Sequence, residues 1–216
     1  MTRPGAIVLC GGQSRRMGQP KAWLRFGDEL MLQRVVRLLG TVAGPIVVVA
    51  APGQEVPELP EGVTIVRDPV SDQGPLRGIA AGLTGLPHHV ELAYATATDV
   101  PFLRPEWVND LVKRIGEGDL AIPEIGGFLH PLAALYRRAT VLPEAERLLG
   151  LGRLRPVFLL EGLRGVRVSE AEMSRIDPGL GTLRNLNTPE DYRQAIRDAG
   201  FETFPSGSAP DDGSNA

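Results

Sequence analysis

The feature that most constrains this chain is the alternation of short, wholly apolar runs with stretches of helical periodicity. The apolar runs cover residues 6–9, 45–51, 63–66 and 92–96. Such runs lack a polar face, which is typical of strands buried on both sides in a parallel sheet. Between the first two runs, apolar residues recur at the spacing of one helix face, at Leu32, Val35, Val36 and Leu39. Strands that alternate with helices predict βαβ units and an α/β fold.

The second half of the chain continues this pattern less regularly. Further strands are expected at residues 120–122, 132–136 and 166–168. Thr188 and Pro189 are typical of a helix start, and this last helix is expected to run to about Ala199. Together, the runs predict a Rossmann-like, three-layer α/β/α fold with a mostly parallel central sheet of about seven strands.

The length of the chain bounds its domain organisation. A chain of 216 residues suffices for one core of this class and is short for two, so residues 1–200 are expected to form a single domain. Residues 201–216 are rich in Ser, Gly, Pro and Asp and cannot bury enough apolar surface to offset the cost of ordering. We therefore expect them to form a disordered C-terminal tail.

The composition excludes several classes of protein. The net charge is −3, which gives no support to nucleic-acid binding through bulk positive charge. The single cysteine forbids an internal disulfide and fits a reducing compartment. The first residues lack the apolar stretch of a signal peptide, and no run is long enough to span a membrane. The expectation is a soluble, cytoplasmic protein that is a monomer or a weak oligomer.

The segment that follows the first apolar run carries the strongest functional signal. Residues 9–21, here called the glycine-rich loop, read LCGGQSRRMGQPK. Glycines after a strand let backbone N–H groups approach an anion closely, and Arg15, Arg16 and Lys21 add positive charge suited to a triphosphate. The segment matches neither the Walker A motif nor the dinucleotide-binding fingerprint. The alternative is a surface turn with solvated arginines.

Two aspartates follow other predicted strands. Asp99 comes after the run at residues 92–96, at the end where α/β sheets place their ligands. A carboxylate there suits Mg²⁺, which takes one or two carboxylates together with phosphate oxygens. The alternative is an aspartate that caps a turn or a helix. Asp68 follows the run at residues 63–66, and contact with a nucleotide and a simple turn are equally compatible with it.

Five motifs, taken together, resemble a known family. Their residues are LCGGQSRRMGQPK at 9–21, GPLRG at 74–78, TDVPFL at 98–103, HPLAALYR at 130–137 and NLNTPED at 185–191. In this order they are similar to the signatures of molybdenum cofactor guanylyltransferases, which are nucleotidyltransferases with a glycosyltransferase-A-type fold. The resemblance runs from about Ala6 to Ala199.

The resemblance implies a reaction and its participants. The terminal phosphate of molybdopterin would attack the α-phosphate of GTP, pyrophosphate would leave, and the guanine dinucleotide form of the cofactor would result. The step would require Mg²⁺. The implied partners are the molybdenum insertase that supplies the substrate and the molybdoenzyme chaperones that receive the product, with no nucleic acid and no membrane involved.

The resemblance also implies roles for individual residues. The catalytic residues would be Arg16, Lys21 and Asp99. The nucleotide would be bound by Leu9, Cys10, Gly11, Gly12, Lys21, Asp68, Pro75, Leu76, Gly78 and Asp99. Asp99 would hold the metal, and the acceptor would be bound by His130, Asn185 and Asn187.

The choice of base has one sequence signal in favour of guanine and one against. Gly11 and Gly12 match the guanylyl members, because the related cytidylyl members have alanine at the first of these positions. An asparagine that often follows the second strand in guanylyltransferases is missing from the segment 49–52, VAAP, in which Ala50 and Ala51 stand instead. A cytidylyltransferase or a sugar-phosphate nucleotidyltransferase is therefore the alternative within this chemistry. The alternative of another class is a non-catalytic nucleotide-binding scaffold.

Overall fold

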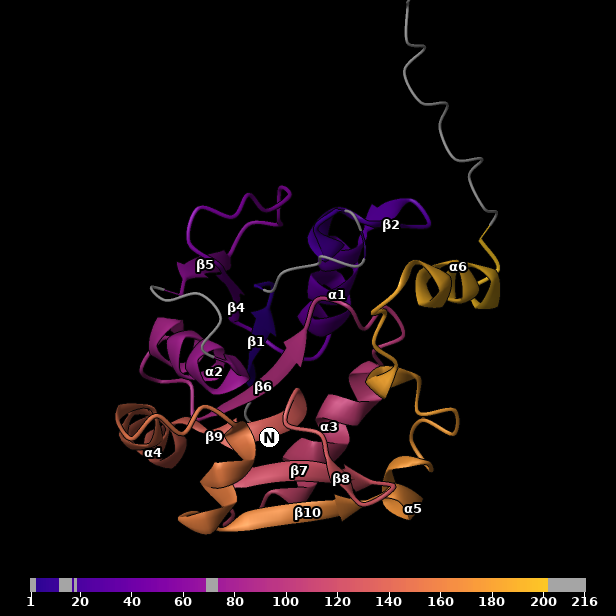
Figure 1. Ribbon diagram of the computed structural model, residues 1–216. Coiled ribbons are helices and arrows are strands. Elements are labelled where there is room, and N and C mark those ends of the chain that lie inside the picture. Colours follow the sequence, from indigo (N-terminus) through magenta and orange to yellow (C-terminus); the bar gives the residue numbers. More distant parts are fainter. Residues whose placement is uncertain (1–2, 12–16, 18, 69–73, 202–216) are drawn as a thin grey trace, which may run out of the picture.

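A computed structural model describes residues 3–11, 17, 19–68 and 74–201 of the protein. Its centre is a twisted sheet with helices on both faces (Figure 1). The strands of this sheet are β1 (Gly5–Leu9), β4 (Ile46–Ala50), β5 (Val63–Arg67), β6 (Leu92–Ala97), β7 (Leu120–Ile125), β8 (Phe128–Leu129), β9 (Ala133–Arg137) and β10 (Gly165–Ser169). The α-helices are α1 (Met31–Gly40), α2 (Gly74–Gly85), α3 (Pro105–Arg114), α4 (Arg138–Gly150), α5 (Glu170–Met173) and α6 (Pro189–Asp198).

The sheet has the strand order β10-β7-β9-β6-β1-β4-β5, with the short β8 paired to β7. Neighbours are parallel from β6 through β1 and β4 to β5, and β10 is parallel to β7. Within this sheet, β9 and β8 are the only described strands that run antiparallel to their neighbours. The predicted α/β fold with a mostly parallel sheet is therefore confirmed, and the eight strands include the short β8 that the sequence did not indicate.

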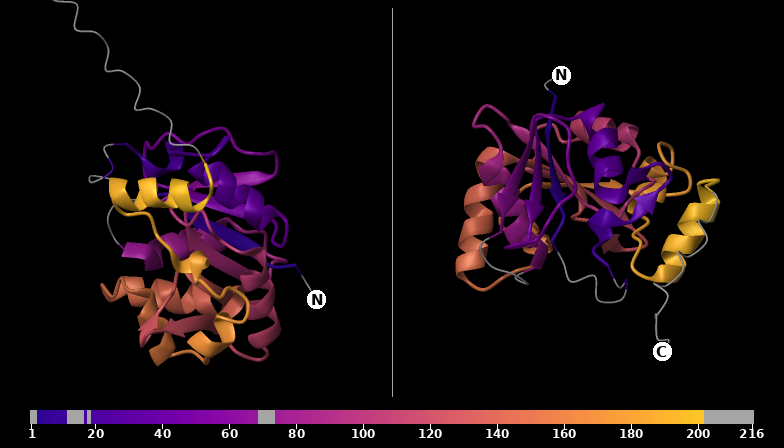
Figure 2. Two further views of the ribbon diagram at one scale, coloured as in Figure 1. Left: turned by 90° about the vertical axis from the view of Figure 1, so that its right-hand side faces the viewer. Right: turned by 90° about the horizontal axis from the view of Figure 1, so that it is seen from above.

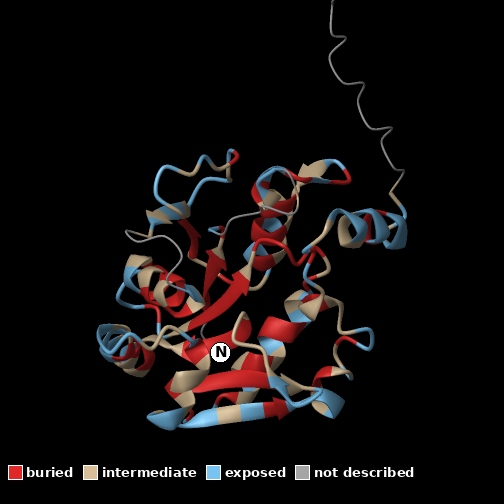
Figure 3. Cartoon of the chain, viewed as in Figure 1, coloured by how far each residue is buried: buried red, intermediate tan, exposed pale blue. Residues whose placement is uncertain are grey.

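The central strands are apolar because both faces of the sheet are covered. In β1, Ala6, Ile7 and Val8 are fully buried. The central strands are coloured as buried in Figure 3. Helices α1 and α3 cover one face of the sheet, and α2 and α4 cover the other (Figure 2). The helix face predicted from residues 32–39 is buried in the first of these layers. No helix in the described parts of the chain has the length and apolarity needed to cross a membrane.

A third, smaller cluster joins the two ends of the chain. The hairpin of β2 (Arg25–Phe26) and β3 (Glu29–Leu30) packs against α6. The Phe26 ring meets the Phe201 ring edge to face, with centroids 5.3 Å apart. Phe201 is the first residue of the expected tail, and residues 202–216 lie outside the described residues. This cluster holds α6 beside the segment that follows the glycine-rich loop.

Three glycines, Gly78, Gly82 and Gly85, let α2 approach the sheet closely and are here called the glycine stripe. A Cβ atom built at Gly78 would lie 2.9 Å from Leu9 Cδ2, and one at Gly85 would lie 2.6 Å from Val66 Cγ2. A Cβ atom built at Gly82 would lie 2.3 Å from Ile7 Cγ2, which is closer than van der Waals contact allows. Because Ile7 is fully buried in the central strand, it has little room to move. The glycine stripe therefore sets the distance between α2 and β1.

We expect Gly82→Ala to destabilise the protein by about 1–3 kcal/mol, because overpacking against Ile7 outweighs the better helix propensity of alanine. Urea denaturation followed by circular dichroism measures this change. Gly150→Ala is the matched control, since Gly150 ends α4 and no atom lies within 4 Å of its built Cβ. Equal stabilities of the two variants would contradict this role for Gly82.

Candidate active site

The candidate site lies where the order of the strands reverses around β1. From β1 the chain builds outward to β4 and β5 on one side and then returns to place β6 on the other. In such sheets, the crevice at the carboxyl ends of the two diverging strands is the usual ligand site. Here the backbone N–H and the hydroxyl of Thr98 both donate to the Leu9 carbonyl, at 3.1 and 3.2 Å. These bonds join the start of the glycine-rich loop to the segment that carries Asp99.

Lys21 and Asp99 form an ion pair at this edge of the sheet. Lys21 Nζ lies 2.5 Å from Asp99 Oδ2, and their side chains are 21% and 10% exposed. Lys21 Nζ also donates to Asn187 Oδ1 at 2.9 Å, and Asn185 Nδ2 donates to Asp99 Oδ1 at 3.3 Å. Segments 78 and more residues apart in sequence thus bring one cation, one carboxylate and two amides together.

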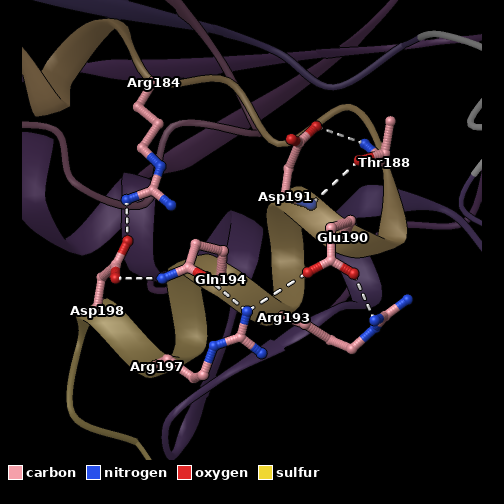
Figure 4. Close-up of polar contacts among 8 residues, drawn as sticks. All are labelled: Arg184, Thr188, Glu190, Asp191, Arg193, Gln194, Arg197 and Asp198. Carbon is pink, nitrogen blue, oxygen red and sulfur yellow. Dashed lines mark hydrogen bonds and ion pairs between the residues drawn. The ribbon is translucent and has the colours of Figure 1, made fainter.

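The position of the two asparagines is fixed by their surroundings. The intervening Leu186 is fully buried beside the β2–β3 hairpin, and its N–H donates to the Asp99 carbonyl at 3.0 Å. Directly after Asn187, Thr188 caps α6 by accepting the Asp191 N–H at 3.1 Å (Figure 4). Asp191 in turn accepts the N–H groups of Asn187 and Thr188 at 3.1 and 2.9 Å. This capping box holds Asn187 at the start of the helix.

The first strand ends beside α2 and the turn after β4. The Leu9 side chain packs under Gly78 of α2, and Gly11 approaches the backbone of Ala51. Leu76 is fully buried in the core between α2 and the sheet, so its side chain is a packing residue rather than part of an open surface. Cys10 is 8% exposed, and burial raises the pKa of its thiol, as expected for an unreactive cysteine.

Other residues that the sequence analysis named lie farther along the same edge of the sheet or outside the described residues. The Asp68 N–H extends the β4–β5 ladder by donating to the Ala50 carbonyl at 2.9 Å. Pro75 is half-buried in the first turn of α2. Gly12 and Arg16 lie outside the described residues.

His130 is placed by β7 rather than by the Lys21–Asp99 pair. Its N–H donates to the Pro123 carbonyl at 2.9 Å. Burial of the half-buried imidazole lowers its pKa, which favours the neutral ring, and a hydrogen bond with the Ile125 backbone acts in the opposite direction. The backbone of His130 is thus held by β7, and its role at the acceptor stays a prediction.

One residue of this edge was not indicated by the sequence. The Gln54 amide reaches back from the turn after β4, where its Nε2 donates to the Cys10 carbonyl at 3.0 Å and its Oε1 accepts the Ala51 N–H at 3.0 Å. The Pro52-Gly53 pair signals the turn in the sequence, but no pattern in the sequence shows where the amide that follows it points.

The donor set at this site suits a hard cation held together with a ligand. No group of three or more His, Cys, Asp or Glu side chains gathers around one point in the described parts of the chain. A dedicated protein cage for a metal is therefore missing from these residues. The Asp99 carboxylate and the neighbouring amide oxygen of Asn187 match the sparse protein ligation of Mg²⁺, whose remaining ligands are phosphate oxygens and water.

A doubly wound sheet with a lysine, a carboxylate and a glycine-rich loop at its switch point defines a class of phosphate-handling α/β proteins. Comparison with known proteins narrows this class. The model of the MobA-like NTP transferase domain matches residues 6–166. The chain therefore belongs to this nucleotidyltransferase family.

Named relatives cover nearly the whole chain. A probable molybdenum cofactor guanylyltransferase of Mycobacterium tuberculosis is 34% identical over 187 residues, which are 85% of this chain and 91% of that protein. One of Methanosarcina mazei is 34% identical over 204 residues, which are 88% and 89% of the two chains. The resemblance found in the sequence motifs is thereby confirmed.

Solved structures agree with the fold. The molybdopterin-guanine dinucleotide biosynthesis protein A of Archaeoglobus fulgidus is 25% identical, with a TM-score of 0.73 over 91% of this chain and 98% of that one. A 2-C-methyl-D-erythritol 4-phosphate cytidylyltransferase of Thermus thermophilus has a TM-score of 0.67 over 91% and 99% of the two chains. At 16% identity, that second likeness shows the fold alone.

The capping box predicts a pH dependence of stability. Hydrogen bonds from the Thr188 side chain and from the backbones of Asn187 and Thr188 lower the pKa of Asp191 below its ordinary 3.8. This stabilisation is present above the unfolded-state pKa and is lost as the pH falls through the lower pKa of the folded state. We therefore expect Asp191→Asn to lower the melting temperature at pH 7. The melting temperature of this variant should also fall less steeply than that of the wild type between about pH 5 and pH 2. Melting curves across this range measure both effects, and Thr188→Ser, which keeps the cap oxygen, should follow the wild type.

Proposed function

We propose that this protein is a magnesium-dependent molybdenum cofactor guanylyltransferase, which transfers GMP from GTP to the terminal phosphate of molybdopterin. An oxygen of the acceptor phosphate would form a bond to the α-phosphorus of GTP. The bond from that phosphorus to the bridging oxygen of the β-phosphate would break, and pyrophosphate would leave. The observation that carries the proposal is the Lys21–Asp99 pair at the switch point, in a chain whose named relatives are guanylyltransferases.

The protein residues would act mainly by positioning charge, as in other phosphoryl and nucleotidyl transfers. Mg²⁺ held by Asp99 would supply neutralisation of the phosphate oxygens when bound. Lys21 would bind the triphosphate and stabilise the charge that develops on the leaving pyrophosphate. Arg16 is assigned the same task by resemblance, from a position outside the described residues.

The Lys21–Asp99 ion pair has a consequence for metal binding. The ammonium group of Lys21 and a divalent cation would compete for the same Asp99 carboxylate, because Lys21 Nζ already lies 2.5 Å from Oδ2. Phosphate oxygens offer Lys21 an alternative partner. We therefore propose that the triphosphate draws Lys21 away from Asp99, so that the metal and the nucleotide bind together.

The remaining assignments follow the arrangement around this pair. We assign the nucleoside end to Leu9, Cys10, Gly11, Gly12, Asp68, Pro75, Leu76 and Gly78, where the side chain of Leu76 would act through packing. Asn185 and Asn187 would meet the acceptor phosphate beside the metal, because they contact Asp99 and Lys21. His130 would lie on the acceptor side.

The proposal extends to the setting of the enzyme. The partners would be the molybdenum insertase and the chaperones of molybdoenzymes, which would supply the acceptor and take the product. The enzyme would act in the cytoplasm, where GTP is available, as a monomer or a weak oligomer.

Nucleotide titrations test the proposed function directly. We expect calorimetry to show GTP binding that Mg²⁺ strengthens, with CTP and ATP binding at least about tenfold more weakly. A preference for CTP would identify a cytidylyltransferase instead. Absence of binding to all three nucleotides would support a scaffold protein.

Substitutions at the pair test its chemical role. We expect Asp99→Ala and Lys21→Ala each to lower guanylyl transfer by about 100-fold or more, because each removes transition-state stabilisation. With Mn²⁺ alone as the probe, Lys21→Ala should bind the metal more tightly than the wild type, and Asp99→Ala should lose this binding. Lys113→Ala and Asp28→Ala, at exposed positions to which the proposal gives no role, serve as matched controls. Turnover at the wild-type rate in either site variant would refute the role of that residue.

A further inference from the structure

The Gln54 amide occupies a gap between the carboxyl ends of β1 and β4. These strands are paired from Ala6 to Leu9, and the Cys10 N–H adds one more bond, to the Val49 carbonyl at 2.8 Å. In a regular parallel ladder, the Ala51 N–H would donate next to the Cys10 carbonyl. Both of these groups bond to Gln54 instead, the first to Oε1 and the second to Nε2, each at 3.0 Å. The Gln54 side chain thus replaces one backbone hydrogen bond between β1 and β4 and stands between the ends of these two strands.

This arrangement requires a carboxamide. The Ala51 N–H needs an acceptor and the Cys10 carbonyl needs a donor, and an amide presents both from one planar group. The same Nε2 lies 3.4 Å from Cys10 Sγ. A carboxylate could accept from Ala51, but its second oxygen would face the Cys10 carbonyl oxygen. An apolar side chain of the same length would leave both partly buried backbone groups without these bonds.

The turn that carries Gln54 is itself well fixed. Pro52 and Gly53 occupy the central positions of a type II turn, with a φ of 67° at Gly53 and a bond from the Gln54 N–H to the Ala51 carbonyl at 3.2 Å. The Arg67 guanidinium donates to the carbonyls of Ala51 and Gln54. The amide is therefore delivered from a turn that is anchored to β5.

The consequence falls on the start of the glycine-rich loop. A Cβ atom built at Gly11 would lie 3.5 Å from the Ala51 nitrogen. Gly11 therefore leaves the sheet directly beside the turn at residues 51–54. The direction in which the loop departs from β1 depends on where the Cys10 carbonyl is held. Gln54 sets that position from a different strand.

We propose that Gln54 is a positioning residue for the nucleotide, acting by wedging β1 and β4 apart so that the backbone at Cys10 and Gly11 is preformed for the nucleoside of GTP. This inference rests on the proposed function of the site as a GTP site. It assigns Gln54 to ground-state binding. Loss of the wedge should therefore raise KM for GTP and leave kcat at saturating GTP nearly unchanged.

Two substitutions at Gln54 test its acceptor and donor bonds, and a second glutamine, Gln33, supplies the control. Gln54→Met keeps the length and removes both bonds, whereas Gln54→Glu keeps the acceptor and loses the donor. Gln33 uses the same chemistry away from the site, since its Oε1 accepts the Leu30 N–H at 3.1 Å and its Nε2 donates to the Glu58 carbonyl at 2.9 Å. Gln33→Met and Gln33→Glu therefore report the general cost of breaking such a bridge.

Two measurements on the full-length chain test the inference. We expect both Gln54 variants to weaken GTP binding about tenfold in calorimetry, with a matching rise in KM and kcat within about threefold of the wild type. Cys10 is the only cysteine of the chain and is buried, so its rate of labelling by a thiol reagent reports opening of this edge. Labelling should be faster in the Gln54 variants and unchanged in the Gln33 variants.

The outcomes distinguish this inference from the proposed function. GTP affinity within twofold of the wild type in Gln54→Met, or an equal loss in the Gln33 variants, would overturn the role of Gln54. Failure of the wild type itself to bind GTP would refute the proposed function. In that case, the labelling rate of Cys10 would still show whether the amide holds the strand ends, and an unchanged rate would overturn the wedge as well.

Discussion

The parallel pairing of β1 between β4 and β6 is the constraint on which the rest of the structure depends. Because β1 lies between β4 and β6 and is buried over residues 5–8, its carboxyl end lies at the edge of the sheet between two neighbouring strand ends. The glycine-rich loop begins there, and Asp99 follows β6 at the same edge. The glycine stripe of α2 supports this arrangement from behind, since it allows a helix to lie directly against Ile7 and Leu9.

The electrostatics of the site follow from this geometry. Asp99 is buried, and a buried carboxylate needs a close counter-charge or strong hydrogen bonds. Lys21 supplies the counter-charge and Asn185 supplies a hydrogen bond. The same carboxylate is the group that our proposal gives to the metal. The ion pair thus compensates the charge of Asp99, and the proposed movement of Lys21 to the triphosphate would release the carboxylate.

The C-terminal part of the chain completes the site from a distance. Asn185 and Asn187 reach Asp99 and Lys21 only because Leu186 is anchored among the β2–β3 hairpin and α6. The Thr188–Asp191 capping box then fixes the chain as it enters α6. A structural helix far from the sheet therefore has a direct effect on the groups that are proposed to bind phosphate. The paired arginines on the outer face of α6, such as Arg193 with Glu190, are surface contacts that contribute little by comparison.

The sequence by itself determined the architecture and the family, because both are written in local patterns. Buried parallel strands must be apolar on both faces, so β1, β4 and β6 could be predicted from continuous apolar runs, and the cap of α6 could be predicted from Thr188, Pro189 and Asp191. The short β8 and the β2–β3 hairpin could not, since two-residue strands carry no periodicity. Only the tertiary structure decided that Asn185 and Asn187 lie at the Lys21–Asp99 pair and that the Gln54 amide replaces a rung between β1 and β4. Hydrogen bonds between segments 44 to 166 residues apart depend on how the chain folds back on itself, and no local pattern encodes that distance.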